Sequence, residues 1–328
     1  MAILVTGGAG YIGSHTVAEL LARGEEVVVI DNLLTGHREA LLGGKLYEGD
    51  LRDKELLAKL FSENNIEAVI HFAASSLVGE SMKDPVKYYD NNVYGTQCLL
   101  EAMQKAGVDK IVFSSTAATY GEPEKVPIEE TDRTEPANVY GETKLTMERM
   151  MSWFDKVLGI KYVALRYFNA AGAHASGKIG EDHRPESHLI PLVLQTALKQ
   201  RESIAVFGDD YPTEDGTCVR DYIHVSDLAD AHVRAVSYLR SGNESNVFNL
   251  GNGLGFSVKQ VIETAKKVTG LEIPVVIQER RAGDPAVLVA SSAKARSVLG
   301  WNPQHADLEN IIQSAWNWHS ANPQGYGE

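Results

Sequence analysis

The first half of the chain alternates short apolar runs with longer segments in which apolar positions recur every three or four residues. The apolar runs predict buried parallel strands, which are covered on both faces and therefore lose strict alternation. They lie at residues 3–6, 26–30, 45–48, 68–72, 110–114 and 161–165. The helical patterns between them are clearest at residues 12–23, 54–63, 86–106 and 139–157. This rhythm predicts an α/β fold built on a doubly wound parallel sheet with right-handed crossovers.

The second half is less regular and richer in turn-forming polar residues. Such stretches lie at residues 172–187, 208–216 and 280–285. Helical patterns remain at residues 191–199, 225–239 and 258–269, with a strand-like run at 274–278. We expect a smaller α/β domain that covers a substrate, packed on the first domain with a cleft between them. The boundary is predicted near residue 170, which gives domains of residues 1–170 and 171–328 with some segments crossing.

A glycine-rich turn follows the first apolar run, at Gly7, Gly10 and Gly13. The first glycine permits the tight turn, the second lets the backbone approach a pyrophosphate, and the third lets the next helix pack closely. The N–H groups at the start of that helix would face the anion. The spacing is GxxGxxG rather than the commoner GxGxxG, and alone it is weak evidence. A second strand ending in Asp31 strengthens it, because an acid at this distance binds the adenosine ribose hydroxyls.

Asp31 also discriminates between the two dinucleotides. Its charge would repel the 2′-phosphate of NADP, although Arg38 lies farther on and could offset that charge. The alternative, a turn residue at a strand end, is weaker because Asp31 stands at the expected offset. The sequence therefore predicts NAD, bound by a Rossmann-type domain at the carboxyl ends of the strands. Asp50, after the third strand, is expected near the adenine.

Tyr140 and Lys144 stand four residues apart in a helical pattern, so their side chains share one face. A phenol beside an ammonium can act as a base. The cation favours the phenolate, so the pKa of Tyr140 is expected to fall from about 10 toward neutrality. Such pairs also occur by chance on solvated helix faces. The glycine-rich turn in the same region favours the catalytic interpretation.

Composition limits the classes of partner. The chain has 328 residues and 44% hydrophobic content, enough for a large core in one or two domains. A net charge of −13 speaks against nucleic acid or an anionic membrane surface, but not against a nucleotide in a locally basic pocket. Cys98 and Cys218 lie far apart, which indicates a reduced, cytoplasmic setting. We recognise no metal-ligand cluster, no apolar run long enough to span a bilayer, and no room for a signal peptide before the first strand.

Motifs are spread along the whole chain. They lie at residues 7–15, 72–74, 114–121, 140–144, 167–169, 210–217 and 220–225. Singly they mark a superfamily, but together they resemble the UDP-galactose 4-epimerases of the extended short-chain dehydrogenase/reductase family. The resemblance implies an isomerase that interconverts UDP-galactose and UDP-glucose with tightly bound NAD. It further implies that Tyr140, held as a phenolate by Lys144, takes the proton of the sugar's 4-hydroxyl while the C4 hydride passes to NAD+. The 4-keto sugar would then turn over and take the hydride back on its other face.

The resemblance also assigns binding residues, each of which has an alternative as core, turn or surface residue when considered singly. The implied cofactor contacts are Gly7, Gly10, Tyr11, Ile12, Gly13, Asp31, Asn32, Leu33, Asp50, Leu51, Phe72, Ala73, Asn91, Tyr140, Lys144 and Phe168. The implied substrate contacts are Thr116, Tyr167, Asn169, His188, Leu189, Ala205, Phe207, Arg220, Arg281, Asp284 and Leu288. The two arginines would hold the diphosphate, because a guanidinium fork pairs with two phosphate oxygens at once.

This sequence departs from the family pattern at several positions. Thr116 replaces a serine and keeps its hydroxyl, Ser76 replaces a lysine that touches the cofactor in many members, and His188 replaces an asparagine. Leu288 stands where some members carry a tyrosine that closes the sugar pocket. Leucine is shorter, so we expect a pocket that also admits UDP-N-acetylglucosamine and UDP-N-acetylgalactosamine.

The resemblance further implies a homodimer that pairs through the helices near residues 86–106 and 139–157. Five apolar positions in these helices could serve the pairing or face the subunit's own sheet: Val93, Leu100, Met103, Leu145 and Met147.

Rival functions fit the residues less well. A nucleotide-sugar 4,6-dehydratase shares the fold and the Tyr–Lys pair, but usually carries an Asp-Glu pair after its threonine for elimination. This chain has Ala117 and Ala118 there. A dehydrogenase that releases NADH would lack a cysteine nucleophile for further oxidation. A non-catalytic NAD or nucleotide-sugar binding protein needs no base, so the presence of Thr116, Tyr140 and Lys144 together argues against it.

Overall fold

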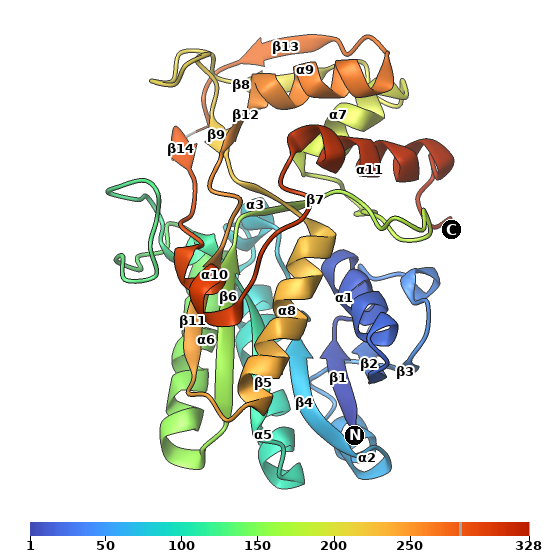
Figure 1. The fold of residues 1–328 in the computed structure, drawn as a ribbon, viewed down its shortest axis with the longest axis vertical. Helices are drawn as coiled ribbons and strands as arrows, with labels where there is room; N and C mark the ends of the chain where they lie inside the picture. Colours follow the sequence, from blue (N-terminus) through green and yellow to red (C-terminus); the bar gives the residue numbers. More distant parts are fainter. Residues whose placement is uncertain (282–283, 328) are drawn as a thin grey trace.

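The computed structural model describes residues 1–281 and 284–327, and a parallel sheet forms its centre (Figure 1). Seven strands lie side by side in the order β11-β6-β5-β4-β1-β2-β3, all parallel. Their bounds are β1 Ala2–Thr6, β2 Glu26–Asp31, β3 Lys45–Glu48, β4 Ile66–His71, β5 Lys110–Thr116, β6 Lys161–Tyr167 and β11 Asn246–Leu250. The chain order reverses between β1 and β4, and ligands of such sheets bind at the carboxyl ends of the strands beside this point.

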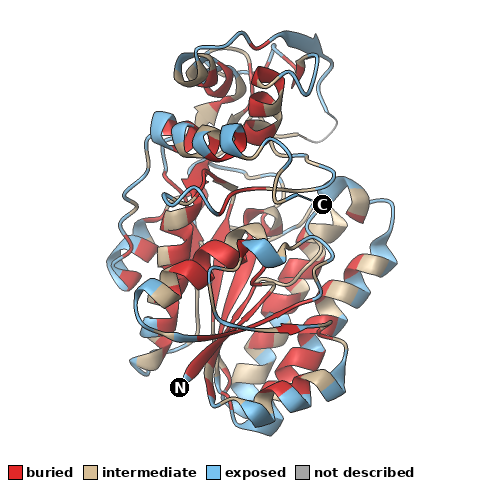
Figure 2. Ribbon diagram, turned by 90° about the vertical axis from the view of Figure 1, so that its right-hand side faces the viewer, coloured by how far each residue is buried: buried red, intermediate tan, exposed pale blue. Residues whose placement is uncertain are grey.

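Helices cover both faces of the sheet because successive strand residues point in opposite directions. Ile3 and Val5 of β1 enter one core with residues of α1 (Tyr11–Ala22) and α8 (Val225–Arg240). Leu4 enters the other core, which is closed by α2 (Lys54–Glu63), α5 (Gly95–Ala106) and α6 (Val139–Leu158). The strands are accordingly buried and the outer helix faces exposed (Figure 2). The predicted doubly wound α/β fold is confirmed.

The long helix predicted at residues 86–106 is interrupted. It consists of α4 (Pro85–Tyr88), a π-helical turn (Tyr89–Tyr94) and α5. Asn92 in the π-helical turn is fully buried and its side chain bonds the backbone N–H and C=O of Ser75, at 2.7 and 3.0 Å. The same amide donates to Thr143 Oγ1 at 3.1 Å, so the irregular turn ties this segment to α6.

The large sheet and the helices on its two faces form a first lobe, the sheet lobe. A smaller lobe, the upper lobe, lies above the carboxyl ends of the strands (Figure 1). Its core gathers α7 (Leu189–Ala197), α9 (Val258–Thr269) and α11 (Leu308–Ala321). Small sheets pair β8 (Ile204–Phe207) with β13 (Val275–Gln278), β7 (Asn169–Ala171) with β10 (Tyr222–His224), and β9 (Val219–Arg220) with β12 (Phe256–Ser257) and β14 (Val287–Leu288). Two further short helices are α3 (Val78–Ser81) and α10 (Ala293–Leu299).

The chain crosses between the two lobes after residue 170. Helix α8 packs on one face of the large sheet, and β11 forms the edge of that sheet beside β6. Strand β11 was not predicted, because asparagines flank the Val-Phe pair of its sequence NVFNL and prevent a continuous apolar run. The division at residue 170 therefore stays an interpretation of the sequence, and both lobes contain residues from beyond it.

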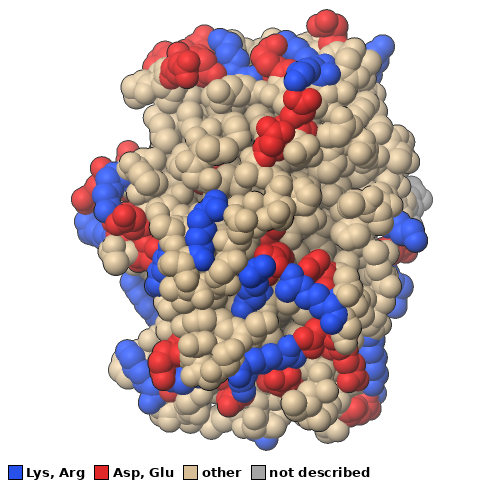
Figure 3. Space-filling model, viewed as in Figure 1, with Lys and Arg blue, Asp and Glu red and all other residues tan. Residues whose placement is uncertain are grey.

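The surface and the helices bear on possible partners. Basic and acidic side chains are interspersed on the face drawn in Figure 3. Within residues 1–281 and 284–327, no helix combines the length and the apolar character needed to cross a membrane. Leu100, Met103 and Met147 are fully buried in the chain's own core, and Leu145 is 4% exposed. Val93 packs against the same core, so these five side chains stabilise the subunit itself.

Candidate active site

The glycine-rich turn between β1 and α1 brings three backbone segments into contact. A Cβ atom on Gly7, whose φ is +69°, would lie 2.6 Å from the backbone nitrogen of Ala73. One on Gly13 would lie 2.1 Å from the Gly7 carbonyl oxygen. Both glycines are therefore required by close approach, whereas a Cβ on Gly10 would meet only the Gly7 oxygen at 3.4 Å. The turn presents bare backbone beside the start of α1, which fits a bound pyrophosphate.

Asp31 at the end of β2 is fixed against this turn. One carboxylate oxygen accepts the N–H of Ala9 at 2.9 Å and the other accepts that of Leu33 at 2.8 Å. Burial raises the pKa of Asp31, while these two hydrogen bonds lower it. Each oxygen keeps a further lone pair, so the carboxylate can still accept the hydroxyls of a ribose. The residues at the turn and at Asp31 thus fit a dinucleotide.

Asn32 and Asp50 meet next to Asp31. The Asn32 amide donates to Asp50 at 3.1 Å, and Arg52 donates to both Asp50 oxygens at 2.7 Å. The guanidinium lowers the pKa of Asp50 to about 2. Leu51, between Asp50 and Arg52 in the sequence, is buried in the core. The structure therefore brings together Asn32, Asp50 and Leu51, three of the predicted cofactor contacts.

Tyr140 and Lys144 lie in the first two turns of α6, beside the end of β5. Asn138 caps the helix by accepting the N–H of Gly141 at 2.8 Å. A Cβ on Gly141 would lie 2.5 Å from the Ala118 carbonyl oxygen, so glycine is what lets α6 approach this closely. The buried ammonium of Lys144 donates to the Ser114 carbonyl at 2.9 Å and lies 5.9 Å from the centre of the Tyr140 ring.

Three further hydroxyl residues lie around this pair, and we call Ser114, Thr116, Tyr140, Lys144 and Tyr167 together the catalytic group. The hydroxyls of Ser114 and Tyr167 are hydrogen-bonded to each other. Thr116 ends β5, and its hydroxyl is a hydrogen-bond partner of the Tyr140 phenol. The predicted catalytic residues therefore lie together where the sheet ends.

The predicted fall in the pKa of Tyr140 is wrong for this structure. Burial raises the pKa of Tyr140 to about 12, opposed in part by the Thr116 hydrogen bond. Burial also lowers the pKa of Lys144 to about 7, opposed by the charge of Glu148. Both charged forms lose hydration, and this loss outweighs their mutual attraction. The sequence argument considered the charge of the pair but not its burial.

The predicted substrate residues form two groups. In the upper lobe Arg220 is ion-paired with Asp284, and the guanidinium of Arg281 lies 3.9 Å from the centre of the Phe207 ring. Nearer the catalytic group, Leu288 packs on a small cluster of Ala117, Tyr120 and Ile128, together with Phe168, which was predicted to contact the cofactor. Ala282 and Gly283, the middle of the Arg-x-Gly-Asp element, lie outside the described residues.

Known proteins resemble this chain over its whole length. Residues 3–251 match the NAD dependent epimerase/dehydratase family. The chain belongs to this family. A UDP-glucose 4-epimerase of Halalkalibacterium halodurans is 61% identical over 326 residues, 99% of this chain and 98% of the relative.

Two solved structures extend the comparison. A crystal structure of a UDP-glucose 4-epimerase superposes with a TM-score of 0.99 at 57% identity, covering 100% of both chains. The structure of UDP-glucose 4-epimerase from Bifidobacterium longum in complex with NAD+ and UDP superposes with a TM-score of 0.93 at 42% identity, covering 99% of this chain and 100% of that one. The family resemblance found in the sequence is confirmed.

Other residues assigned from the epimerase resemblance have partners within the protein. The Tyr11 hydroxyl donates to the Gly172 carbonyl at 2.6 Å, and the Phe72 ring packs on His232 with 4.6 Å between ring centres. Asn91 donates to the Ser75 hydroxyl at 3.2 Å. The remaining assigned residues keep these positions: Ile12 packs on the sheet core, Asn169 lies in β7, Leu189 begins α7 and Ala205 lies in β8. Their ligand contacts stay predictions.

Two buried charges that support the epimerase-like site were missed in the sequence. Glu148 accepts from Arg166 through both carboxylate oxygens, at 2.9 and 2.5 Å, and from the Ser115 hydroxyl at 2.5 Å. This pair joins α6, β6 and β5 directly behind Thr116. A signal was present, because Arg166 interrupts an otherwise apolar strand and Glu148 follows Lys144 by one helical turn.

Asp221 was read only as part of a motif, although it joins three segments. Its carboxylate accepts the N–H of Asn252 at 2.7 Å and those of Gly253 and Ala290 at 3.2 Å each. The side chain is fully buried, and burial raises its pKa to about 6. In the described part of the chain no cationic side chain pairs with this carboxylate, and the three backbone amides stabilise it.

Proposed function

We propose that the protein is an NAD-dependent UDP-glucose 4-epimerase, an isomerase that interconverts UDP-galactose and UDP-glucose. The observation that carries the proposal is the meeting of Thr116, Tyr140 and Lys144 at the end of β5. These groups lie in a chain whose residues 3–251 match the epimerase/dehydratase family and which matches UDP-glucose 4-epimerases over nearly its full length.

NAD fits the first lobe. Gly7, Gly10 and Gly13 offer the backbone for its pyrophosphate, and Asp31 offers free lone pairs for its adenosine ribose. Lys144 would bond the nicotinamide ribose. The chemistry that NAD+ would supply, held by these residues, is a reversible acceptor for the C4 hydride and a positive charge that favours the Tyr140 phenolate.

Side chains of the protein would take up and return the proton of the sugar's 4-hydroxyl. Tyr140 would accept the proton of the sugar's 4-hydroxyl at its phenolic oxygen, and Thr116 would hydrogen-bond the same hydroxyl. Lys144 would hold its charge near the phenol while anchored to the Ser114 carbonyl. Ala117 and Ala118 follow Thr116 in a 3₁₀ turn and supply no acid or base for elimination, which disfavours a dehydratase.

Binding of the nucleotide would fall to the upper lobe. Arg220 and Arg281 would share the diphosphate, with Asp284 near the ribose and Ala205, Phe207 and Leu189 near the uracil. Arg220 now pairs with Asp284, and a diphosphate would offer its guanidinium a second, doubly charged partner. Tyr167, Asn169 and His188 would complete the sugar and diphosphate contacts.

Leu288 would set the size of the sugar pocket. It packs with Phe168 beside Ala117, next to Thr116, so its side chain is near the reacting end of the substrate. A leucine leaves space that a tyrosine would fill. We therefore propose that UDP-N-acetylglucosamine and UDP-N-acetylgalactosamine are also interconverted, and an absence of turnover of UDP-N-acetylgalactosamine would contradict this part.

A homodimer and a cytoplasmic location complete the proposal. Tyr94 at the π-helical turn and Trp153 and Val157 on α6 are exposed apolar side chains on the two helices expected to pair. Both cysteines are free and buried, in keeping with a reducing compartment. Molar mass in solution by light scattering tests the dimer.

The decisive experiment is incubation of the purified protein with UDP-galactose and no added NAD, with the UDP-sugars resolved by chromatography. Appearance of UDP-glucose would establish the reaction and a resident cofactor. If nothing forms, the incubation is repeated with NAD. Continued absence of product, with a folded protein, would contradict the proposal and favour another nucleotide sugar or a binding role. Tyr140→Phe is the matched inactive control.

A further inference from the structure

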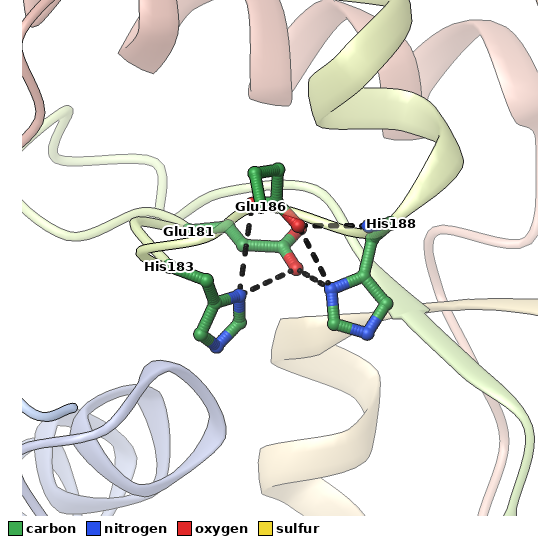
Figure 4. Close-up of side chains that lie close together, drawn as sticks. All are labelled: Glu181, His183, Glu186 and His188. Carbon is green, nitrogen blue, oxygen red and sulfur yellow. Dashed lines mark hydrogen bonds and ion pairs between the residues drawn. The ribbon is translucent and has the colours of Figure 1, made fainter. Parts of the chain in front are cut away.

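Four potential metal ligands converge in the loop that leads into α7. Glu181, His183, Glu186 and His188 alternate along eight residues of sequence, and their side chains point toward one another (Figure 4). One donor atom from each lies within 4.8 Å of every other. The sequence analysis missed this cluster, although its E-x-H-x-x-E-x-H spacing was a visible signal.

The separations between the donor atoms are those of a small coordination sphere. His188 Nδ1 lies 2.8 Å from Glu181 and 3.2 Å from Glu186. His183 Nδ1 lies 3.3 Å from Glu181 and 3.6 Å from Glu186. Four ligands placed about 2.0–2.1 Å from a tetrahedral Zn²⁺ are separated from one another by about 3.3 Å. The four measured edges scatter around that value.

One donor atom is unsatisfied inside the protein. His183 Nδ1 is buried and makes no hydrogen bond, although it lies 3.3 Å from a Glu181 oxygen. The distance is short enough for a hydrogen bond, so its orientation is what fails. Glu181 itself has a side chain only 4% exposed. The nitrogen is within ion-pair distance of both carboxylates but hydrogen-bonds to neither, and an ion shared by the three groups would satisfy it.

We propose that Glu181, His183, Glu186 and His188 form a Zn²⁺ site. Imidazole nitrogen combined with carboxylate oxygen at this spacing suits Zn²⁺, whereas Mg²⁺ and Ca²⁺ prefer oxygen ligands alone in larger shells. Two carboxylates neutralise the ion's charge, so the site is electrically balanced with neutral imidazoles. All four tetrahedral positions are filled by protein, which is the pattern of a structural rather than a catalytic zinc.

The site would fix the loop between the two lobes. On one side the His183 ring meets the Tyr11 ring edge-on, with 6.2 Å between centres, at the start of α1. On the other side His188 directly precedes α7; its Nδ1 faces the cluster, and its Nε2 would stay available for the proposed substrate contact. A cavity of about 550 Å³ lined by Glu181, His183, Glu186 and Trp318 adjoins the cluster and offers an entry path. Metal binding would therefore order the segment that carries the proposed uracil-side Leu189.

The test uses the full chain without a histidine tag. The protein is stripped with a chelator and dialysed, and Zn²⁺ binding is followed by calorimetry and by elemental analysis after desalting. We expect about one Zn²⁺ per chain and a midpoint of thermal unfolding higher by about 4 °C at about 100 times Kd. Co²⁺ in place of zinc should give the visible absorption of a tetrahedral site. Mg²⁺ should change nothing.

Variants assign the site to these residues. Glu181→Gln keeps the shape of the side chain, and His183→Ala removes the unsatisfied nitrogen; each should lose the bound ion, the cobalt spectrum and the thermal shift. The matched control is His174→Ala, a partly exposed histidine whose Nδ1 bonds Ser176, and it should keep all three.

Several outcomes would overturn the proposal. They are a wild-type protein that retains no zinc after desalting, a stoichiometric zinc that both variants keep, and cobalt bound without the tetrahedral spectrum. All three readouts are independent of turnover, so they are unaffected by whether the proposed epimerase activity is correct.

Discussion

The two lobes build their parts of the site in opposite ways. In the sheet lobe Lys144 is buried and its ammonium rests on a backbone carbonyl, beside the hydroxyls of Ser114 and Thr116. In the upper lobe Arg220 of β9 and Asp284 of a separate segment pair as opposite charges, with 14% and 30% of their side chains exposed. The first arrangement buries one ammonium among hydroxyls and a carbonyl, and the second holds a partly exposed guanidinium that can meet an anion. Substitutions in the catalytic group should therefore lower kcat, and those in the upper lobe should raise KM.

The largest effect is expected for Tyr140→Phe. Loss of the phenolic oxygen removes the group that takes the proton, so kcat should fall by about 10²- to 10⁴-fold. The ring remains beside Lys144, so KM and the thermal unfolding midpoint should change little. Steady-state kinetics and a melting curve on the same preparation check this. A fall in affinity without a fall in kcat would remove the distinction between the lobes.

The sheet lobe was predictable because its signals are local. Apolar runs, glycine spacing and the acid after β2 lie within about 30 residues of one another, as a βαβ unit requires. Strand ends were correct to within two residues at most positions, as β5 shows by reaching Thr116 rather than residue 114. The meeting of Tyr140 and Lys144 with β5 followed from the family pattern.

What the sequence did not reveal depends on contacts between distant segments. Strand β11 follows α8 and forms the edge of the sheet, and the two asparagines in its five residues break the apolar run that marks the other strands. The Glu148–Arg166 pair is explicable only once α6 is seen to cross β6. The direction of the Tyr140 pKa shift was wrong for the same reason, because burial is a property of the fold and not of a spacing.

Asp221 combines features of the two lobes. It follows Arg220 of the upper lobe, yet it is buried and its carboxylate accepts hydrogen bonds from three backbone amides. Its folded pKa of about 6 lies above the unfolded value of about 3.9. The folded state therefore binds the proton more tightly, and stability from this group is lost as pH rises from about 4 to about 6. Two pKa units correspond to about 3 kcal/mol.

Asp221→Asn removes this titration. Free energies of unfolding by urea should show the wild type losing up to about 3 kcal/mol relative to the variant between pH 4 and pH 6.5. Above pH 6.5 the difference between the two proteins should be constant. Parallel curves across the whole range would show that the three amide hydrogen bonds fully offset burial, and that Asp221 behaves as an ordinary carboxylate.

Arg220→Gln sharpens the upper-lobe half of the comparison. The variant loses a charge-assisted contact worth about 1.5–3 kcal/mol, so KM for UDP-galactose should rise by about 10- to 150-fold. The value of kcat should stay within a few-fold, since the catalytic group is untouched. Arg220→Lys serves as the matched control, because it keeps the charge but not the two-pronged guanidinium. Its KM should lie between those of the wild type and Arg220→Gln. Unchanged KM in both variants would assign the diphosphate to other residues.

The smallest effect concerns Leu288, an upper-lobe residue that packs on the cluster of Ala117 just beyond the end of β5. Leu288→Tyr adds a ring beside Phe168 and Ala117, where the N-acetyl group would need room. The ratio of kcat/KM for UDP-N-acetylgalactosamine over UDP-galactose should fall by about tenfold or more, with turnover of UDP-galactose kept. Leu288→Met, which conserves volume, should leave the ratio near the wild-type value. If tyrosine leaves the ratio unchanged as well, Leu288 supports the fold beside Thr116 and does not line the pocket. The contrast between the lobes would then hold without exception, with selectivity arising elsewhere in the upper lobe.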